Sequence, residues 1–316
     1  MEKKYKYPNA CLHLLFLFLI TSCISSPATQ PAAYVDLSNL QPLPTPVDDE
    51  IVPLRIAIAA VISPKGSAES YGPLLDYIGE QLDRPVERVQ RRTYAEVNEL
   101  VESGEVDFAF VCTSSYIIGK SDFGMQLLVA PQVNGEAVYR AKIIVPADST
   151  AETLEDLRGK VFAFTDPMSF SGRMHPTYLL HQMEETPETF FAQTFFTYSH
   201  DDAIYAVADG LADGASVDSL VLDFLLKRDT NIGSKIRVIH TSEPFGIPPV
   251  VVGPDIRPKL LAQLKEILLN AHLTPEGQAA LEALDIDKFV VIGEEAFQTV
   301  EEILSLLNTC YTCEEE

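Results

Sequence analysis

Asp166 to Gly172, which reads Asp-Pro-Met-Ser-Phe-Ser-Gly, combines hydroxyl groups with the predicted start of a helix. It follows a predicted strand at Val161–Phe164. Free backbone N–H groups at a helix start favour a bound oxyanion. Ser169 and Ser171 would add two hydroxyl donors. The alternative is that one of these serines only caps the helix, and the sequence leaves both interpretations open.

A second polar segment, Tyr198 to Asp202, also lies between a predicted strand and a predicted helix. Its central residue, His200, is able to donate a hydrogen bond to an anion. The alternative for His200 is a capping or packing role. The segment therefore adds a candidate anion donor without deciding its function.

Polar residues occur at comparable positions in the preceding part of the chain. Thr113 and Ser114 follow an apolar run at Val106–Val111, and Tyr94 opens a helix that Thr93 can cap. The carboxyl ends of strands in such sheets face a ligand cleft. We therefore expect these residues to meet the two later segments from the opposite side of a cleft.

The sequence contains no recognisable catalytic or metal-binding pattern. It has no nucleophile–base pair, no G-x-S-x-G turn and no His, Cys and carboxylate cluster with metal-ligand spacing. We expect no enzyme activity, no metal and no cofactor. Cys112 lies in an apolar run and is interpreted as a core residue. Cys310 and Cys313 indicate a local disulfide or a frayed terminus.

Hydrophobic periodicity predicts two α/β lobes. Strands are expected at 54–60, 86–89 and 106–111 in the first lobe and at 141–146, 161–164, 194–198, 214–217 and 236–240 in the second. Helices are expected at 71–82, from 94 until Gly104, at 154–157, from 172 to about 183, at 201–209 and at 218–227, with a loop at 63–70. The alternation of strands and helices favours largely parallel sheets.

The chain then returns to the first lobe. Residues 249–253 are expected to cross back, and helices follow at 257–271, after Thr274 and at 294–307. The pattern predicts a bilobal α/β clamp, with lobe 1 formed by 51–145 and 248–316 and lobe 2 by 146–247. Hinges are expected near Ala147 and at Phe245–Pro249, with a ligand in the cleft.

The charge of the chain is strongly negative. The sequence carries 46 Asp and Glu residues against 23 Lys and Arg residues, a formal net charge of −23. Nucleic acid is an unsuitable partner, because phosphate backbones require basic patches. Any anion bound by this chain must be held by local N–H groups and hydroxyls against the long-range field.

The N-terminus has the pattern of a secretory signal peptide. Basic residues precede a short apolar run at Leu12–Ile20, which is shorter than the ~20 residues of a membrane span. Leu19–Cys23 resembles a bacterial lipobox, which implies cleavage after residue 22, lipid attachment to Cys23 and a tethered position outside the cytoplasm. The alternative is an ordinary signal peptide with a chance cysteine. Residues 23–50 are proline-rich and are expected to form a linker.

Several segments, taken in order, resemble a known family. They are Ser103–Ala109, Tyr139–Val145, Leu154–Lys160, Asp166–Gly172 and Ser199–Asp201. Together they are similar to the phosphonate, phosphite and phosphate-binding components of bacterial ABC importers, from about Leu54 to about Leu284. This resemblance implies a type II periplasmic-binding-protein fold.

The resemblance also implies roles for individual residues. Ser169, Ser171 and His200 match oxyanion-binding residues, and Tyr94 matches a tyrosine of the first lobe. Phe170 stands where the family usually has threonine, so one hydroxyl donor is absent. The ligand-binding residues expected on this basis and from the residue patterns are Tyr94, Thr113, Ser114, Ser169, Phe170, Ser171, Gly172, His200 and Asp218.

Other positions depart from the family pattern. Leu220 and Pro248 fall where carboxylates recognise the amine of an aminoalkylphosphonate, and Val111 falls on a cleft tyrosine. A smaller or more apolar ligand, or a different oxyanion, fits these residues better. Asp218 lies nearby and is able to contact a ligand, although capping of the following helix is the favoured role.

The expected function is therefore binding of a small phosphorus oxyanion for an ABC importer. The expected partners are a permease and an ATPase, with the binding protein acting as a monomer on a lipid anchor. One alternative is a ligand-sensing protein that serves a membrane receptor and binds a different small molecule. A further alternative is an enzyme on the same fold, for which Cys112 is the candidate thiol.

Overall fold

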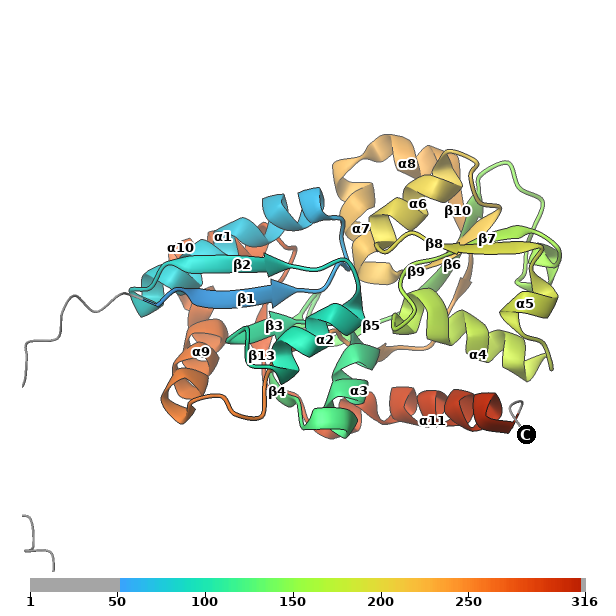
Figure 1. Ribbon diagram of the computed structural model, residues 1–316. Coiled ribbons are helices and arrows are strands. Elements are labelled where there is room, and N and C mark those ends of the chain that lie inside the picture. The colour runs from blue at the N-terminus through green and yellow to red at the C-terminus, as the bar shows by residue number, and fades with distance from the viewer. Residues whose placement is uncertain (1–51, 314–316) are drawn as a thin grey trace, which may run out of the picture. The chain divides into compact units, whose positions relative to one another are not determined.

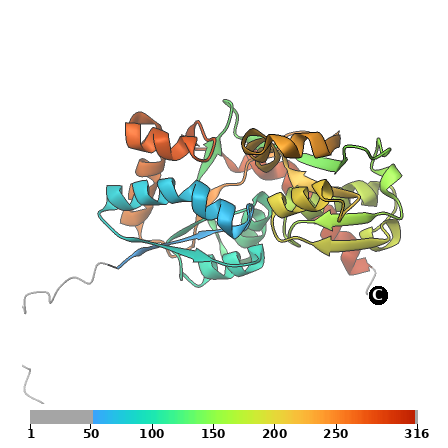
Figure 2. The same cartoon turned by 90° about the horizontal axis from the view of Figure 1, so that it is seen from above.

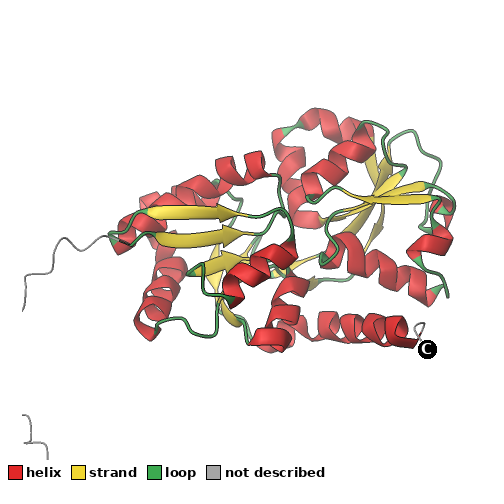
Figure 3. Ribbon diagram, in the orientation of Figure 1, coloured by secondary structure: helices red, strands yellow, loops and turns green. Residues whose placement is uncertain are grey.

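The computed structural model describes residues 52–313, without the side chains of Pro64 and of residues 308–313 (Figure 1). The predicted signal peptide at 1–22, Cys23, the linker and the side chains of Cys310 and Cys313 lie outside the described residues. Two separate mixed sheets organise the described chain (Figure 3). We call the part built on the six-stranded sheet lobe 1 and the part built on the five-stranded sheet lobe 2.

Lobe 1 is built on a sheet with the strand order β13-β4-β12-β3-β1-β2. The strands are β1 (Leu54–Ile58), β2 (Val86–Gln90), β3 (Phe108–Phe110), β4 (Gln126–Gln132), β12 (Val250–Val252) and β13 (Lys288–Val290). β1 pairs in parallel with β2 and β3, whereas β12 runs antiparallel between β3 and β4. The predicted return of the chain at 249–253 is therefore correct.

Helices cover both faces of the lobe 1 sheet, because successive side chains of a strand point to opposite faces. Ile56 and Ile58 belong to one core and Ala57 to the other. The first core packs against α1 (Pro64–Leu82), α9 (Pro258–Asn270) and α10 (Pro275–Glu282). The second packs against α2 (Tyr94–Glu102), α3 (Thr113–Phe123) and α11 (Gln298–Cys313). Short 3-10 turns, η4 (Ala271–Leu273) and η5 (Glu294–Phe297), complete this part.

Lobe 2 has the strand order β10-β6-β9-β7-β8. The strands are β6 (Ala141–Pro146), β7 (Val161–Phe164), β8 (Gln193–Phe196), β9 (Gly214–Asp218) and β10 (Ile236–Thr241). One face packs against α6 (His200–Ala208), α7 (Ser219–Arg228) and α8 (Thr230–Lys235). The other face packs against η2 (Glu155–Leu157), α4 (His175–Gln182) and α5 (Pro187–Phe190). β6 and β9 of this sheet also contact η3 (Phe170–Met174). Figure 2 shows the two lobes side by side.

Two short strands connect the lobes. β5 (Val138–Tyr139) pairs antiparallel with β11 (Phe245–Gly246) outside both sheets. The predicted hinge at Phe245–Pro249 coincides with β11. The other boundary was wrong: β6 belongs to the lobe 2 sheet, so the chain leaves lobe 1 before Ala141 rather than after residue 145. The adjoining strand β5 pairs with the other connection, so the two crossings of the chain lie side by side. That the crossings act as hinges stays a prediction, and the position expected near Ala147 lies beyond β6, inside lobe 2.

The predicted loop at 63–70 was also wrong, because α1 already begins at Pro64. Proline is favoured in the first turn of a helix. In addition, the Asp201 carboxylate of lobe 2 accepts a hydrogen bond from the Ser63 backbone N–H at 2.8 Å. A negative charge at this end of a helix is stabilising. The first two turns of α1 therefore depend on a tertiary contact that sequence periodicity does not register.

The last helix extends from lobe 1 along lobe 2. α11 contacts α3 and also α4, beneath which it runs in Figure 1. Glu294, which begins the η5 turn directly before α11, accepts hydrogen bonds from the Tyr116 hydroxyl and the Lys120 ammonium, each at 2.6 Å. Among the described helices, none combines the length and the apolar character that a membrane crossing requires.

Candidate oxyanion site between the lobes

Polar residues that follow β2, β3, β7, β8 and β9 meet where the two lobes touch. The Tyr94 backbone N–H of lobe 1 donates to the Asp166 carboxylate of lobe 2 at 3.1 Å. The Ser114 hydroxyl of lobe 1 donates to the Met168 carbonyl of lobe 2. The predicted residues Tyr94 and Ser114 thus do face the Asp166–Gly172 segment from the opposite lobe.

Local sequence explains why Tyr94 is placed at this contact. Thr93 and Glu96 form a capping box in which Thr93 Oγ1 accepts the Glu96 N–H at 3.2 Å and Glu96 Oε2 accepts the Thr93 N–H at 2.9 Å. A capping box fixes the first residue of its helix. The Tyr94 N–H, left without an intrahelical acceptor, is then free to reach Asp166.

Ser169 caps the turn that opens α4. Its Oγ accepts the Gly172 N–H at 3.1 Å and lies 3.4 Å from Nε2 of His200. The Oγ atom of Ser169 therefore both caps this turn and lies next to the His200 ring. Gly172 is required at this turn, because a Cβ atom there would overlap the buried side chain of Thr165.

The tautomer of His200 follows from its partners. Nδ1 accepts the Asp218 backbone N–H at 3.0 Å, so Nδ1 carries no hydrogen. Burial lowers the pKa of His200 to about 3, and the ring is neutral. The remaining hydrogen must lie on Nε2, which faces Ser169. The Nε2–Oγ distance of 3.4 Å is longer than an ordinary N–H···O hydrogen bond, so the Nε2–H of His200 and the hydroxyl hydrogen of Ser169 are both open to a ligand.

Three buried hydroxyl groups at the lobe contact have no hydrogen-bond partner among the described residues. They belong to Tyr94, Tyr139 and Ser171. Burial raises the pKa of both tyrosines well above 10, with smaller contributions from the Cys112 thiol and Asp218. These phenols stay protonated and can donate. A buried donor without an acceptor is costly, so these hydroxyls are placed to donate to a bound ligand.

Asp218 has the capping role that was favoured from the sequence. Its carboxylate accepts the Leu220 backbone N–H at 2.7 Å at the start of α7. Burial raises the pKa of this carboxyl to about 7, although the backbone N–H groups of α7 oppose the shift. Near neutral pH a large fraction of Asp218 is therefore uncharged, which reduces its repulsion of a nearby anion.

Thr113 and Phe170 turn away from this cluster toward the hinge. The Thr113 hydroxyl donates to the Gly246 carbonyl of β11 at 2.8 Å. The Phe170 ring packs edge-on against Phe245, with centroids 4.7 Å apart. Their side chains connect the cluster to the hinge strand. A contact between the Phe170 ring and a ligand stays a prediction.

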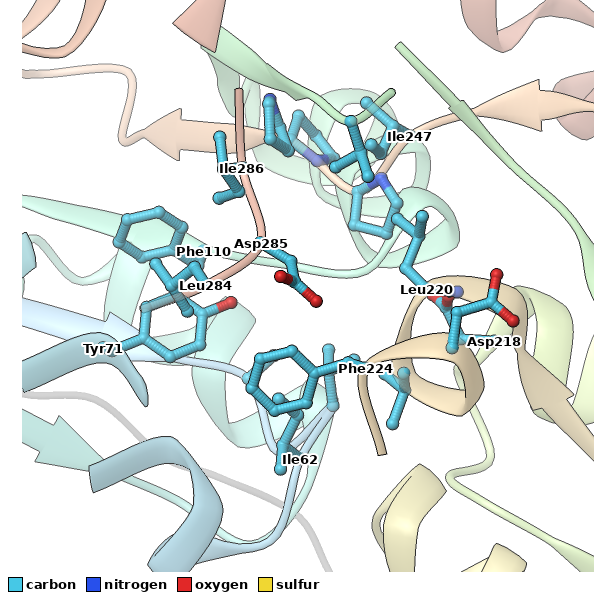
Figure 4. Close-up of a pocket in the computed structure, with 18 of the residues that line it drawn as sticks. Ile62, Tyr71, Phe110, Asp218, Leu220, Phe224, Ile247, Leu284, Asp285 and Ile286 are labelled. Atoms are coloured by element: carbon cyan, nitrogen blue, oxygen red, sulfur yellow. The ribbon is translucent and has the colours of Figure 1, made fainter. Parts of the chain in front are cut away.

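A cavity of about 330 Å³ adjoins the cluster at the lobe contact (Figure 4). Of the nine predicted ligand-binding residues, Asp218 alone lines it. Val111, Leu220 and Pro248, the three positions that depart from the family pattern, line it as well. The structure thus divides the predicted residues into a tightly packed polar cluster and a neighbouring, larger and mainly apolar space.

Comparison with known proteins identifies the family. Residues 56–297 match the family model described as "ABC transporter, phosphonate, periplasmic substrate-binding protein". The chain belongs to this family. It is thus a substrate-binding component of the ABC-transporter type, as the sequence resemblance indicated.

Individual relatives are more distant. The phosphate-import protein PhnD of Mycolicibacterium smegmatis is 26% identical over 226 residues, which cover 67% of this chain and 70% of that protein. A binding protein of an ABC phosphonate transporter from Pseudomonas aeruginosa has a TM-score of 0.75 at 19% identity, covering 79% of this chain and 84% of its own. PhnD1 of Prochlorococcus marinus, solved with methylphosphonate, has a TM-score of 0.73 at 17% identity, covering 81% and 98%. These structures confirm the predicted bilobal type II periplasmic-binding-protein fold.

Sequence reasoning missed two residues of the cluster in this substrate-binding protein. Tyr139 was noted only as part of a family segment, yet its hydroxyl approaches those of Thr113 and Ser171. Their proximity lowers the pKa of Tyr139 against the larger effect of burial, although neither contact has the geometry of a hydrogen bond. Cys112 is buried in the core, as predicted, but its thiol also lies 3.6 Å from the Ser114 hydroxyl. Burial raises the pKa of the Cys112 thiol, so it stays uncharged. For Tyr139, its position beside the hinge was the one available signal.

Proposed function

We propose that this substrate-binding protein binds a small phosphorus oxyanion of the phosphate, phosphite or phosphonate class between its lobes. Ser169, Ser171 and His200 of lobe 2 donate hydrogen bonds to the oxyanion. Tyr94 of lobe 1 and Tyr139 of the hinge complete the set of donors. The protein binds and releases the ligand without making or breaking a bond.

The observation that carries this proposal is the group of unpartnered hydroxyls of Tyr94, Tyr139 and Ser171. They are neutral donors on three separate elements. His200 lies beside them, and its tautomer places its ring hydrogen on Nε2. An anion in a low-dielectric site is held by such donors more strongly than in water. Neutral donors also suit a chain of net charge −23, which offers no attractive long-range field.

Membership of the family supports a location outside the cytoplasm and a role beside a permease and an ATPase. We further propose that lipid on Cys23 tethers the protein to the membrane and that it acts as a monomer. Replacement of Cys23 by alanine is expected to release the protein from the membrane fraction. Mass spectrometry of the membrane-bound protein would show a lipid-sized mass increase at its N-terminal cysteine, and an unmodified Cys23 would contradict the anchor.

The ligand is identified by isothermal titration of the purified full-length chain in detergent with phosphate, phosphite, methylphosphonate and sulfate. We expect at least one phosphorus oxyanion to bind. Loss of one hydrogen bond to a charged ligand costs about 1.5–3 kcal/mol, so Ser171→Ala and His200→Ala should each weaken binding about 10- to 100-fold.

Ser234→Ala provides a matched control, because Ser234 is exposed on α8 and its hydroxyl donates only to the Asn231 carbonyl at 2.7 Å. This variant should bind like the wild type. If no phosphorus oxyanion binds, or if Ser171→Ala and His200→Ala bind as tightly as Ser234→Ala, the proposed ligand class or site is wrong.

A further inference from the structure

The cavity beside Asp218 is lined mainly by carbon. Four aromatic rings contribute to its wall, from Tyr71 and Phe110 of lobe 1, Phe224 of lobe 2 and Phe289 of β13. Figure 4 shows Leu220 and Ile247 facing this space from the side opposite Tyr71 and Phe110. Ligand sites of this composition bind apolar groups and use a few polar atoms for orientation.

Three of the four ionisable Asp and Lys residues that line the cavity have ion-pair partners. Asp285 pairs with Lys227 at 3.0 Å, and Asp223 pairs with Lys142 at 2.8 Å. These pairs are partly solvent-exposed, so they form a rim rather than an interior charge. Burial raises the pKa of Tyr71 to about 12, which keeps its hydroxyl neutral.

Asp218 is the remaining carboxyl group at the cavity and has no ion-pair partner among the described residues. Burial raises its pKa to about 7 and it already accepts the Leu220 backbone N–H, so near neutral pH the wall offers an ammonium group no fully charged partner.

Two residues connect the cavity to the polar cluster. Asp218 lines the cavity, while its backbone N–H donates to His200. Val111 lines the cavity and immediately precedes Cys112, which lies in the cluster. A ligand whose anionic head meets Ser169 and His200 thus has an apolar space directly beside that head.

The size of the cavity exceeds what a bare oxyanion needs. An apolar cavity of about 150 Å³ is sufficient to bind benzene. The volume here is about 330 Å³, which accommodates a phenyl ring or a branched alkyl group with space remaining.

We propose that the ligand is an organophosphonate with an uncharged aromatic or branched aliphatic substituent, and that this substituent occupies the cavity. The inference rests on the proposed function, because the cluster must hold the phosphonate head. It assigns specificity to the cavity wall, with Leu220 and Phe224 as the lobe 2 residues that contact the substituent.

Titration of the full-length chain with phosphate, methylphosphonate, phenylphosphonate and 2-aminoethylphosphonate tests the inference. Each buried methylene group contributes about 0.8 kcal/mol, close to a fourfold gain in affinity. Phenylphosphonate should therefore bind about 10- to 100-fold more tightly than methylphosphonate. 2-Aminoethylphosphonate should bind more weakly than phenylphosphonate, because its ammonium would lose water without gaining a partner.

Two variants of α7 localise the substituent. Leu220→Glu places a charge in the cavity wall and should weaken phenylphosphonate binding at least tenfold more than methylphosphonate binding, because both lose affinity through repulsion of the head and only phenylphosphonate also loses an apolar contact. Phe224→Ala removes one aromatic wall and should reduce the preference for phenylphosphonate without adding a charge. Leu211→Glu is the control, because Leu211 is 70% exposed in the same lobe and does not line the cavity.

The possible outcomes separate the two proposals. If methylphosphonate binds and phenylphosphonate does not, or if the aminoethyl compound binds more tightly, the inference about the substituent fails and the proposed function stands. If phenylphosphonate binds equally to the wild type, Leu220→Glu and Phe224→Ala, the substituent lies elsewhere and the inference also fails. If no phosphorus compound binds, the proposed function itself fails.

Discussion

The Asp218 backbone N–H donates to Nδ1 of His200 at 3.0 Å and thereby fixes which ring nitrogen faces Ser169. A backbone donor cannot change its protonation state, so this contact excludes the Nδ1–H tautomer. Because burial also lowers the pKa of His200 to about 3, the ring acts as a neutral donor through Nε2. Anion binding in this site does not require a charged histidine.

We predict that His200 keeps its Nε2–H tautomer, and stays neutral, from pH 8 down to pH 5. Nitrogen-15 NMR of the labelled full-length chain distinguishes the two ring nitrogens, and comparison with His200→Gln assigns the signals. The ring signals should not move over this range. A titration midpoint between pH 5 and 8 would show that the ring becomes charged and that the assignment of its role is wrong.

Contacts between the lobes should set the apparent affinity without touching the ligand. The Asp201 carboxylate of lobe 2 accepts the backbone N–H of Ser63 in lobe 1. The backbone N–H of His200 donates to the Val61 carbonyl at 3.0 Å. A ligand that needs closed lobes binds more weakly when the closed population falls. Asp201→Ala should therefore weaken phosphonate binding about tenfold, as expected for a hydrogen bond to a charged group.

The matched control is Asp209→Ala, which removes an ion pair of 3.1 Å with Lys235 inside lobe 2. It should leave the affinity unchanged. Calorimetry gives both affinities, and small-angle scattering of the unliganded chains should show more open lobes for Asp201→Ala alone. Equal affinities for the two variants would contradict a closing role for Asp201.

The exposed ion pair across the cavity rim should contribute much less. Lys227 and Asp285 come from different lobes, but their side chains are 60% and 36% exposed. Exposed pairs of this kind are worth about 0–1 kcal/mol. Lys227→Met should change phosphonate affinity by less than about fivefold, and 0.5 M salt should remove the difference from the wild type. A larger loss of affinity in calorimetry would contradict this expectation and show that the pair contributes strongly to lobe closure.

Gly172 is a position where one methyl group should be disruptive. A Cβ atom there would overlap Oγ1 of Thr165, whose side chain is fully buried and cannot move into solvent. Overpacking in such a place costs about 1–3 kcal/mol. Gly172→Ala should lower the melting temperature and weaken ligand binding, because the same turn holds Ser169 and Ser171. Gly72→Ala is the matched control, because nothing lies within 4 Å of a Cβ atom there and its φ is not positive, so its melting temperature and ligand affinity should not fall.

The sequence was most informative where one element alone determines its structure. β6 and β7 have the predicted bounds because β-branched and aromatic residues form short buried runs there. Thr93 and Thr274 cap the helices that they were expected to cap. In contrast, α3 was not predicted. Its buried residues begin with the polar run Thr113 to Ser115, which gives no apolar periodicity.

The site was only partly predictable, for a related physical reason. Ser169 and His200 follow recognisable strand-to-helix turns, and their types suggested an anion. The cavity is assembled from side chains of both lobes and the return segment, including Tyr71, Leu220 and Phe289. Each is an ordinary core residue within its own element, so its role emerges only when the lobes are brought together.

The buried imidazoles should make the fold sensitive to acid. Burial lowers the pKa of His175 and His200 to about 3, and it raises the pKa of Asp218 to about 7. In the unfolded chain these groups titrate near pH 6.5 for histidine and near pH 3.9 for aspartate. Between about pH 4 and 6.5 the unfolded chain therefore carries one proton on each histidine and none on Asp218. The folded chain carries none on the two histidines and one on Asp218.

For these three groups the unfolded state binds one proton more than the folded state over this window. The free energy of unfolding should then rise with pH by about 1.4 kcal/mol per pH unit from pH 4 to 6.5. His175→Gln removes one of the two histidines and should reduce the slope by about that amount, because a glutamine does not titrate. Urea unfolding followed by circular dichroism at pH 4.5, 5.5 and 6.5 measures both slopes. If the two proteins show parallel stability curves, His175 is protonated in the folded state and its burial is not what limits stability in acid.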